Sequence, residues 1–146
     1  MSNPGRNGLD SPLECPPGTD YHEDTFLYFL AVEQAHAERS NHPLRVLFAT
    51  LEPNPGRPDP IPPATAARLF EGLRLSLRET DVTGWYRQHR VAGAVLSERA
   101  DRSGSDVSGV IQKRVGEGLR QRLPSNVARS LCVRVIPLRP ERFGNG

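Results

Sequence analysis

Residues 44–51, LRVLFATL, constrain the fold of this chain more than any other stretch. The run is rich in aliphatic and β-forming side chains, and it is apolar on both faces except for Arg45 and Thr50. This pattern predicts a central strand that helices cover on at least one face. Prolines then recur from Glu52 to Pro63, which predicts a stiff loop that cannot be helical.

Apolar residues at three-and-four spacing predict three helices. The first starts at Asp24 as N-cap and ends near Ser40. The second starts at Pro63, and the third follows Ser105 as N-cap and stops at Pro124. Their apolar faces comprise Phe26, Leu27, Phe29, Leu30 and Ala37; Ala66, Leu69, Phe70, Leu73 and Leu77; and Val107, Val110, Ile111, Val115, Gly118, Leu119 and Leu123.

Two short strands, 82–86 and 91–97, form a predicted hairpin with a tight turn at Gln88-His89. A last strand over 129–138 contains Pro137, which places it at a sheet edge or at its own end. The resulting order predicts an α+β fold, a ferredoxin-like βαββαβ unit with an extra N-terminal helix. We expect one domain over 21–139, with flexible tails at 1–20 and 140–146.

The formal charge of +2 comes from interspersed acidic and basic residues, so we expect no nucleic-acid partner. Cys15 and Cys132 lie far apart, which indicates free thiols in a reducing compartment, and the expected location is the cytoplasm. No apolar run approaches the length of a membrane span, so we expect no membrane partner. The four histidines have no metal-ligand spacing with the cysteines, and we expect neither a metal nor a cofactor.

Residues 73–96 resemble the GGDEF family of diguanylate cyclase domains, and the similarity extends over about 20–139. That family has a helix, an Arg-x-x-Asp pair, an aromatic residue, the Gly-Gly-Asp/Glu-Glu-Phe signature and an apolar strand. Here Arg78 and Asp81 form the pair, and Tyr86 is the aromatic residue before the signature. The five signature positions hold Arg87, Gln88, His89, Arg90 and Val91. The resemblance implies a palm fold like that of nucleotidyl cyclases.

The resemblance also implies that catalysis has been lost. The family binds two divalent metals with carboxylates from the end of its first strand and from the signature turn. Here Thr50 replaces the first acid, Glu52 stands where a second acid is usual, and Arg90 replaces a metal-binding or basic Glu. Arg87 and Gln88 replace the two glycines that let the backbone approach the nucleotide. The loop that would recognise guanine is rebuilt from proline.

The Arg78 and Asp81 pair survives, and in the resembled family it forms an inhibitory site for cyclic di-GMP. An Arg fork can bind guanine O6 and N7, while a carboxylate can accept from guanine N–H groups. The same two residues also suit the end of a helix for purely structural reasons.

Three functions follow from these observations. The first is a regulatory or interaction module in bacterial signalling that acts through 78–91, with cyclic di-GMP reception by Arg78 and Asp81 as its ligand-binding variant. The second is a divergent metal-dependent enzyme that uses Glu52. The third is a scaffold that binds a protein partner, or itself as a homodimer, through the Phe26 and Phe29 helix or the hairpin. Trp85 and Tyr86 could stack on a base, but packing against the sheet face or a helix fits Trp85 better.

Overall fold

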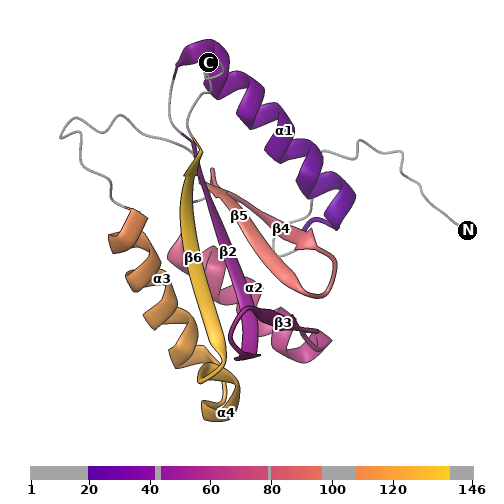
Figure 1. The fold of residues 1–146 in the computed structure, drawn as a ribbon, viewed down its shortest axis with the longest axis vertical. Helices are drawn as coiled ribbons and strands as arrows, with labels where there is room; N and C mark the ends of the chain where they lie inside the picture. Colours follow the sequence, from indigo (N-terminus) through magenta and orange to yellow (C-terminus); the bar gives the residue numbers. More distant parts are fainter. Residues whose placement is uncertain (1–19, 42–43, 79, 97–107, 139–146) are drawn as a thin grey trace, which may run out of the picture.

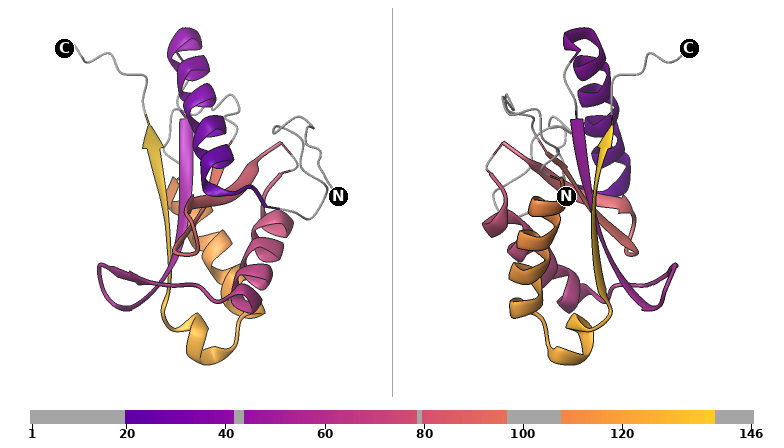
Figure 2. Two further views of the ribbon diagram at one scale, coloured as in Figure 1. Left: turned by 90° about the vertical axis from the view of Figure 1, so that its right-hand side faces the viewer. Right: turned by 60° about the vertical axis from the view of Figure 1, so that its left-hand side comes forward.

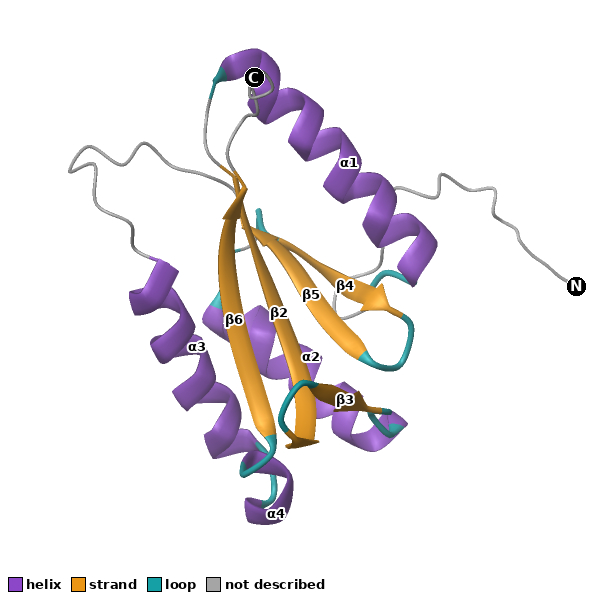
Figure 3. Cartoon of the chain, in the orientation of Figure 1, coloured by secondary structure: helices purple, strands orange, loops and turns teal. Residues whose placement is uncertain are grey.

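The computed structural model describes residues 20–41, 44–78, 80–96 and 108–138. In chain order these residues form α1 (Glu23–Ser40), β2 (Leu44–Asn54), β3 (Arg57–Asp59), α2 (Pro63–Ser76), β4 (Val82–Arg87), β5 (Val91–Leu96), α3 (Ser108–Arg122), α4 (Ser125–Ala128) and β6 (Leu131–Leu138). Figure 1 follows this order by colour, and Figure 3 separates helices from strands. The predicted alternation of helices and strands is confirmed, with the short elements β3 and α4 added.

The sheet is antiparallel throughout, with β6, β2, β5 and β4 side by side in that order. The short strand β3 pairs with the end of β2. Helix α2 connects β2 to β4, and α3 leads from β5 toward β6, so each crossover skips one strand (Figure 1). The α+β class is therefore confirmed, and the strand order is compatible with a ferredoxin-like fold.

One face of the sheet packs against α2 and α3 and carries the larger core. Leu47, Ala49 and Leu51 point to this face because successive strand residues point to opposite sides. The ring of Trp85 reaches Phe70 of α2 with 5.0 Å between centroids, in an edge-to-face arrangement. Trp85 is therefore buried against a helix, which was the simpler of its two interpretations.

The opposite face is covered in part by α1, which crosses β4 and β5 (Figures 1 and 2). Its anchor is Phe26, whose side chain is fully buried. The ring lies on Gly84 and Gly93, which face each other across β4 and β5. A Cβ at Gly93 would lie 2.9 Å from Cζ of Phe26, so the ring can sit this close only because that position carries no side chain.

The prediction of a stiff loop over 52–63 is wrong for the part that forms the end of β2 and β3. Strand β2 continues to Asn54, Gly56 turns the chain with φ of 84°, and β3 pairs back on β2. Prolines are tolerated there because β3 is an edge strand. The segment is not helical before Pro63, where α2 starts as predicted.

The other corrections concern element ends. Helix α1 starts at Glu23, so His22 rather than Asp24 occupies the N-cap position. The last strand starts at Leu131, because Arg129 and Ser130 form the turn that follows α4. Val110 is 67% exposed and does not belong to the buried face of α3. Residues 1–19 and 139–146 and the predicted cap Ser105 lie outside the described residues.

Candidate functional site

The signature positions and the end of β2 lie at the same end of the sheet. The antiparallel register pairs Ala49 with Ala92, so the turn before β5 lies beside the residues that follow Ala49. The turn also contacts the segment after β3, where the Ile61 N–H donates to the His89 carbonyl over 2.7 Å. The Arg90 guanidinium donates to the Pro58 carbonyl over 3.2 Å. Thr50, Glu52 and the turn therefore lie at one end of the sheet.

The Glu52 carboxylate is held by groups of the same chain. The Thr50 hydroxyl donates to one oxygen over 2.6 Å, and the Gly56 N–H donates to the other over 3.0 Å. Arg134 of β6 approaches the second oxygen to 3.7 Å. The hydrogen bond from Thr50 lowers the pKa of Glu52, and the Gly56 amide and the Arg134 charge act in the same direction. Thr50 and Glu52, which the resemblance aligns with metal-binding positions, thus fasten the hairpin of β2 and β3.

The predicted turn at Gln88-His89 is confirmed, since the Arg90 N–H donates to the Arg87 carbonyl over 3.0 Å. His89 adopts φ of 65°, in the left-handed region where Gly or Asn is commoner. Its ring packs 5.5 Å from that of Trp85 between centroids. The turn is therefore fixed by side-chain packing rather than by glycine.

Gln88 makes a reciprocal contact with the start of α1. The Gln88 N–H donates to the Glu23 carboxylate over 2.6 Å, and the Glu23 N–H donates to the Gln88 side-chain oxygen over 2.8 Å. His22 supplies no side-chain cap to this helix. Gln88, 65 positions away, therefore acts as the cap by satisfying a first-turn N–H of α1.

Arg78 and Asp81 lie beyond the end of α2, at the end of β4 opposite the turn. The Asp81 carboxylate accepts from the Arg78 backbone N–H over 2.9 Å, and its other contact with that residue is a 3.9 Å approach of the guanidinium. The Asp81 side chain is only 4% exposed. This geometry is the helix-end arrangement expected for structural reasons, and the Arg78 side chain is 42% exposed.

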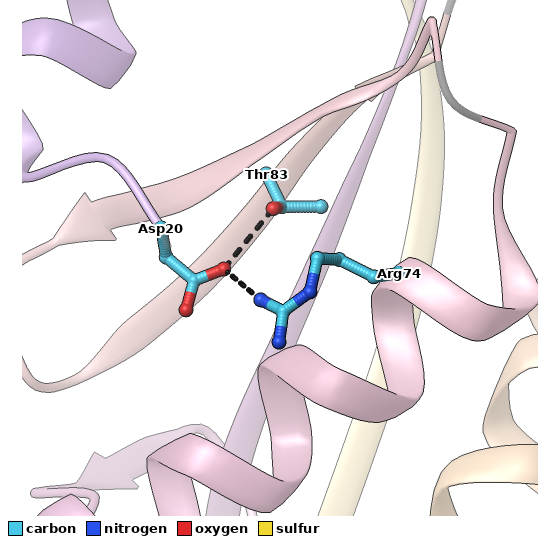
Figure 4. Close-up of polar contacts among 3 residues, drawn as sticks. All are labelled: Asp20, Arg74 and Thr83. Atoms are coloured by element: carbon cyan, nitrogen blue, oxygen red, sulfur yellow. Dashed lines mark hydrogen bonds and ion pairs between the residues drawn. The ribbon is translucent and has the colours of Figure 1, made fainter. Parts of the chain in front are cut away.

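Asp20 forms a further cluster that the sequence pattern did not reveal (Figure 4). One of its oxygens accepts from the Arg74 guanidinium over 2.8 Å and from the Thr83 hydroxyl over 3.2 Å. Burial raises the pKa of Asp20, while the Arg74 charge and the two hydrogen bonds oppose the rise. Arg74 is thereby engaged with Asp20.

The next residue completes this attachment of the N-terminal segment. Tyr21 forms a parallel bridge with Gly84, and its carbonyl accepts from the Trp85 N–H over 3.0 Å. Asp20, placed in the predicted tail, is therefore bound to the domain. No local pattern could have indicated this, because its partner Arg74 lies 54 positions away.

Among the described residues no group of three or more His, Cys, Asp or Glu side chains could hold a metal ion. Cys132 is a free thiol, and Cys15 lies outside the described residues. None of the described helices is long and apolar enough to span a bilayer. No protein-family model matches the sequence, and no curated protein matches it either. The GGDEF resemblance therefore rests on the residues quoted for it above.

Proposed function

We propose that this chain is a catalytically inactive GGDEF-like palm domain that serves as a regulatory and interaction module in bacterial signalling, acting through residues 78–91. One observation carries the proposal: the polar side chains at the former metal and glycine positions are bound within the chain. Glu52 holds the hairpin and Gln88 caps α1. These side chains have taken structural roles in place of nucleotide and metal binding.

Electrostatics supports the loss of catalysis. A two-metal reaction on a nucleoside triphosphate needs carboxylates that face the metals. Both Glu52 oxygens already accept hydrogen bonds, and Arg134 lies near one of them. Arg90 adds a positive charge at a position where the family has an acid, and this charge would repel a divalent cation.

The exposed cations of the turn indicate the chemistry of a partner. Arg87 and Arg90 are both exposed and flank the fixed turn. The Arg87 guanidinium lies 6.0 Å from the Tyr86 ring centroid, and Arg90 is oriented by the Pro58 carbonyl. Two arginines on a rigid turn can bind carboxylates in pairs, so an acidic protein surface is the partner that fits best.

A capture experiment tests this function. The wild-type domain is immobilised and exposed to a bacterial lysate, beside the variant Arg87→Glu/Arg90→Glu. Arg114→Glu/Arg120→Glu, which reverses two exposed charges on α3, is the matched control. We expect a bound protein that the turn variant loses and the control keeps. If no protein is lost selectively by the turn variant, the turn is not the interaction surface.

The enzyme alternative is tested by thermal unfolding with millimolar GTP and Mg²⁺. We expect no magnesium-dependent rise in Tm, because the metal positions are filled or cationic. A rise that Glu52→Gln abolishes would replace the proposed function with a metal-dependent enzyme. Glu38→Gln, which removes an exposed acid on α1, controls for the change in charge.

Reception of cyclic di-GMP is the second candidate, favoured by the Arg78 side chain, which is 42% exposed and lies beside Asp81. Calorimetric titration of the wild type and Arg78→Ala with the dinucleotide measures it. Micromolar binding, about −8 kcal/mol, that is lost in Arg78→Ala and kept in Arg120→Ala would establish a receptor. Absence of heat at hundreds of micromolar ligand would mean that Arg78 and Asp81 have only a structural role at the end of the helix.

A further inference from the structure

Helix α1 presents an apolar outer face that nothing described in the structure covers. Its inner side supplies Phe26 and Ala37 to the core, whereas Leu27, Tyr28 and Val32 are 36%, 53% and 42% exposed. These three large side chains lie on one half of the helix. An apolar group of this kind on a single helix is typical of an interaction surface.

The spacing of the outer face matches a helix that packs against another helix. Asp24, Tyr28, Ala31 and Ala35 follow one another at steps of four, three and four residues. This is the repeat of the a and d positions in a coiled-coil seam. Two alanines in the middle allow close approach of a second helix, while Val32 flanks the seam.

The seam is complementary to itself when a second copy runs antiparallel. With the two-fold axis between Ala31 and Val32, Tyr28 faces Ala35 of the other copy, so a large side chain meets a small one. The same register brings Asp24 opposite Arg39 at both ends. Each pair therefore occurs twice across the axis, once from each copy, as a two-fold interface requires.

Charge selects this orientation over the parallel one. A parallel pair in register would place Asp24 beside Asp24 and Arg39 beside Arg39, which is repulsive. Among the described residues neither side chain has an ion-pair partner in its own chain, and both are exposed. Antiparallel helices also set opposite dipole ends next to each other. The charges at the two ends of α1 therefore fit a second copy.

We propose that the chain forms a two-fold homodimer through the outer face of α1, with α1 of one copy antiparallel to α1 of the other. This goes beyond the proposed function, because the β4 and β5 turn is not part of the surface. Because one helix of each copy supplies the whole surface, we expect a buried area below the roughly 1,200–2,000 Å² of stable interfaces and a dimer that dissociates on dilution.

Sedimentation over a concentration series tests the dimer. We expect a mass of twice 16.2 kDa at high concentration that falls to one chain on dilution. Val32→Asp places a charge beside the seam, next to the two-fold axis, and is expected to give a monomer throughout. Val110→Asp, at an exposed apolar position on α3, is the control and is expected to keep the dimer. Circular dichroism and thermal unfolding verify that both variants fold.

A charge exchange tests the orientation. Asp24→Arg and Arg39→Asp each create like charges across the axis, and each is expected to weaken dimerisation at least several-fold. The double variant Asp24→Arg/Arg39→Asp restores opposite charges and is expected to recover it. A monomeric wild type at every concentration, or equal effects of Val32→Asp and Val110→Asp, would overturn the interface. Failure of the double variant to recover would overturn the antiparallel register.

Discussion

The two faces of the sheet are stabilised in different ways. The face under α2 and α3 carries a broad core to which both helices and four strands contribute. The face under α1 depends on a small cluster around Phe26, supplemented by polar attachments at the start of that helix. In a broad core many neighbours share the effect of a substitution. On the α1 face the effect falls on the Phe26 ring and on Gly84 and Gly93 beneath it, which together are called the glycine seat.

The contrast assigns different tasks to the two faces. The face under α2 and α3 carries most of the buried apolar side chains and so contributes most to folding. The α1 face fixes a helix whose outer side remains apolar, and Gln88 links the start of that helix to the turn. A shift of α1 would therefore also shift the turn, because Glu23 of α1 and Gln88 of the turn share two hydrogen bonds.

Replacement of Phe26 by Ala has the largest expected effect. Loss of a fully buried aromatic side chain lowers the free energy of unfolding by about 3–5 kcal/mol. Because Phe26 is the main anchor of α1, hydrogen exchange should rise first in α1 while α2 and α3 keep their protection. Phe70→Ala in the broad core is the comparison, and it should lower protection in all elements together. Equal protection of α1 in the wild type and Phe26→Ala would show that the polar attachments alone hold the helix.

Gly93→Ala tests the glycine seat. The added Cβ would lie 2.9 Å from the Phe26 ring, so the ring must shift, and the free energy of unfolding should fall by about 1–3 kcal/mol. A smaller side chain, Phe26→Leu, should cost less in the Gly93→Ala background than alone, which a double-mutant cycle in denaturant measures. Gly109→Ala, where the new atom meets nothing within 4 Å, is the control. If both glycine variants behave alike, the seat is not tight.

The periodic parts of this fold could be predicted from sequence, and the contacts between distant segments could not. Leu69, Phe70 and Leu73 are buried in α2 because the repeat of a helix reports which side faces a core. Short β3 was missed because proline argues against strands, although Pro55-Gly56 is itself a turn signal.

The candidate site divides in the same way. Alignment to the family placed Thr50, Glu52 and the turn at one end of the sheet, and strand register does bring them there. Hydrogen bonds from Gln88 to Glu23 join residues 65 positions apart, so no local pattern encodes them. Val110 continues the apolar period of α3 and yet is 67% exposed, because the period shows which residues are apolar and not which of them the folded chain covers.

Arg74→Met tests the attachment that joins the two faces at the edge of β4. The substitution leaves the partly buried Asp20 carboxylate without its cation, and we expect a loss of about 1–3 kcal/mol in the free energy of unfolding at neutral pH. The pKa of Asp20 already lies above its ordinary 3.8 because of burial. The folded chain therefore holds this proton more tightly than the unfolded chain, and stability from this group falls as pH rises from 3.8 through the raised pKa.

The pH dependence supplies the control for that variant. Below pH 3.8 the carboxyl is protonated in both states, so the loss caused by Arg74→Met should shrink. Asp20→Asn/Arg74→Met, which has no carboxylate to leave unpaired, should recover part of the loss at neutral pH. A loss of equal size at every pH would mean that Arg74 acts through the packing of its stem and not through Asp20.

Glu52→Gln gives the smallest effect and the opposite pH dependence. The pKa of Glu52 is lowered below its ordinary 4.5 by the hydrogen bond from Thr50, with help from Gly56 and Arg134. Its contribution is therefore present above pH 4.5 and is lost as pH falls through the lowered pKa. Gln offers one acceptor oxygen in place of two, so we expect a loss of about 0.5–1.5 kcal/mol at neutral pH that disappears in acid. Denaturant unfolding between pH 3 and 7, with Glu38→Gln as the surface-charge control, measures it. A loss that persists in acid would mean that the charge of Glu52 does not stabilise the hairpin.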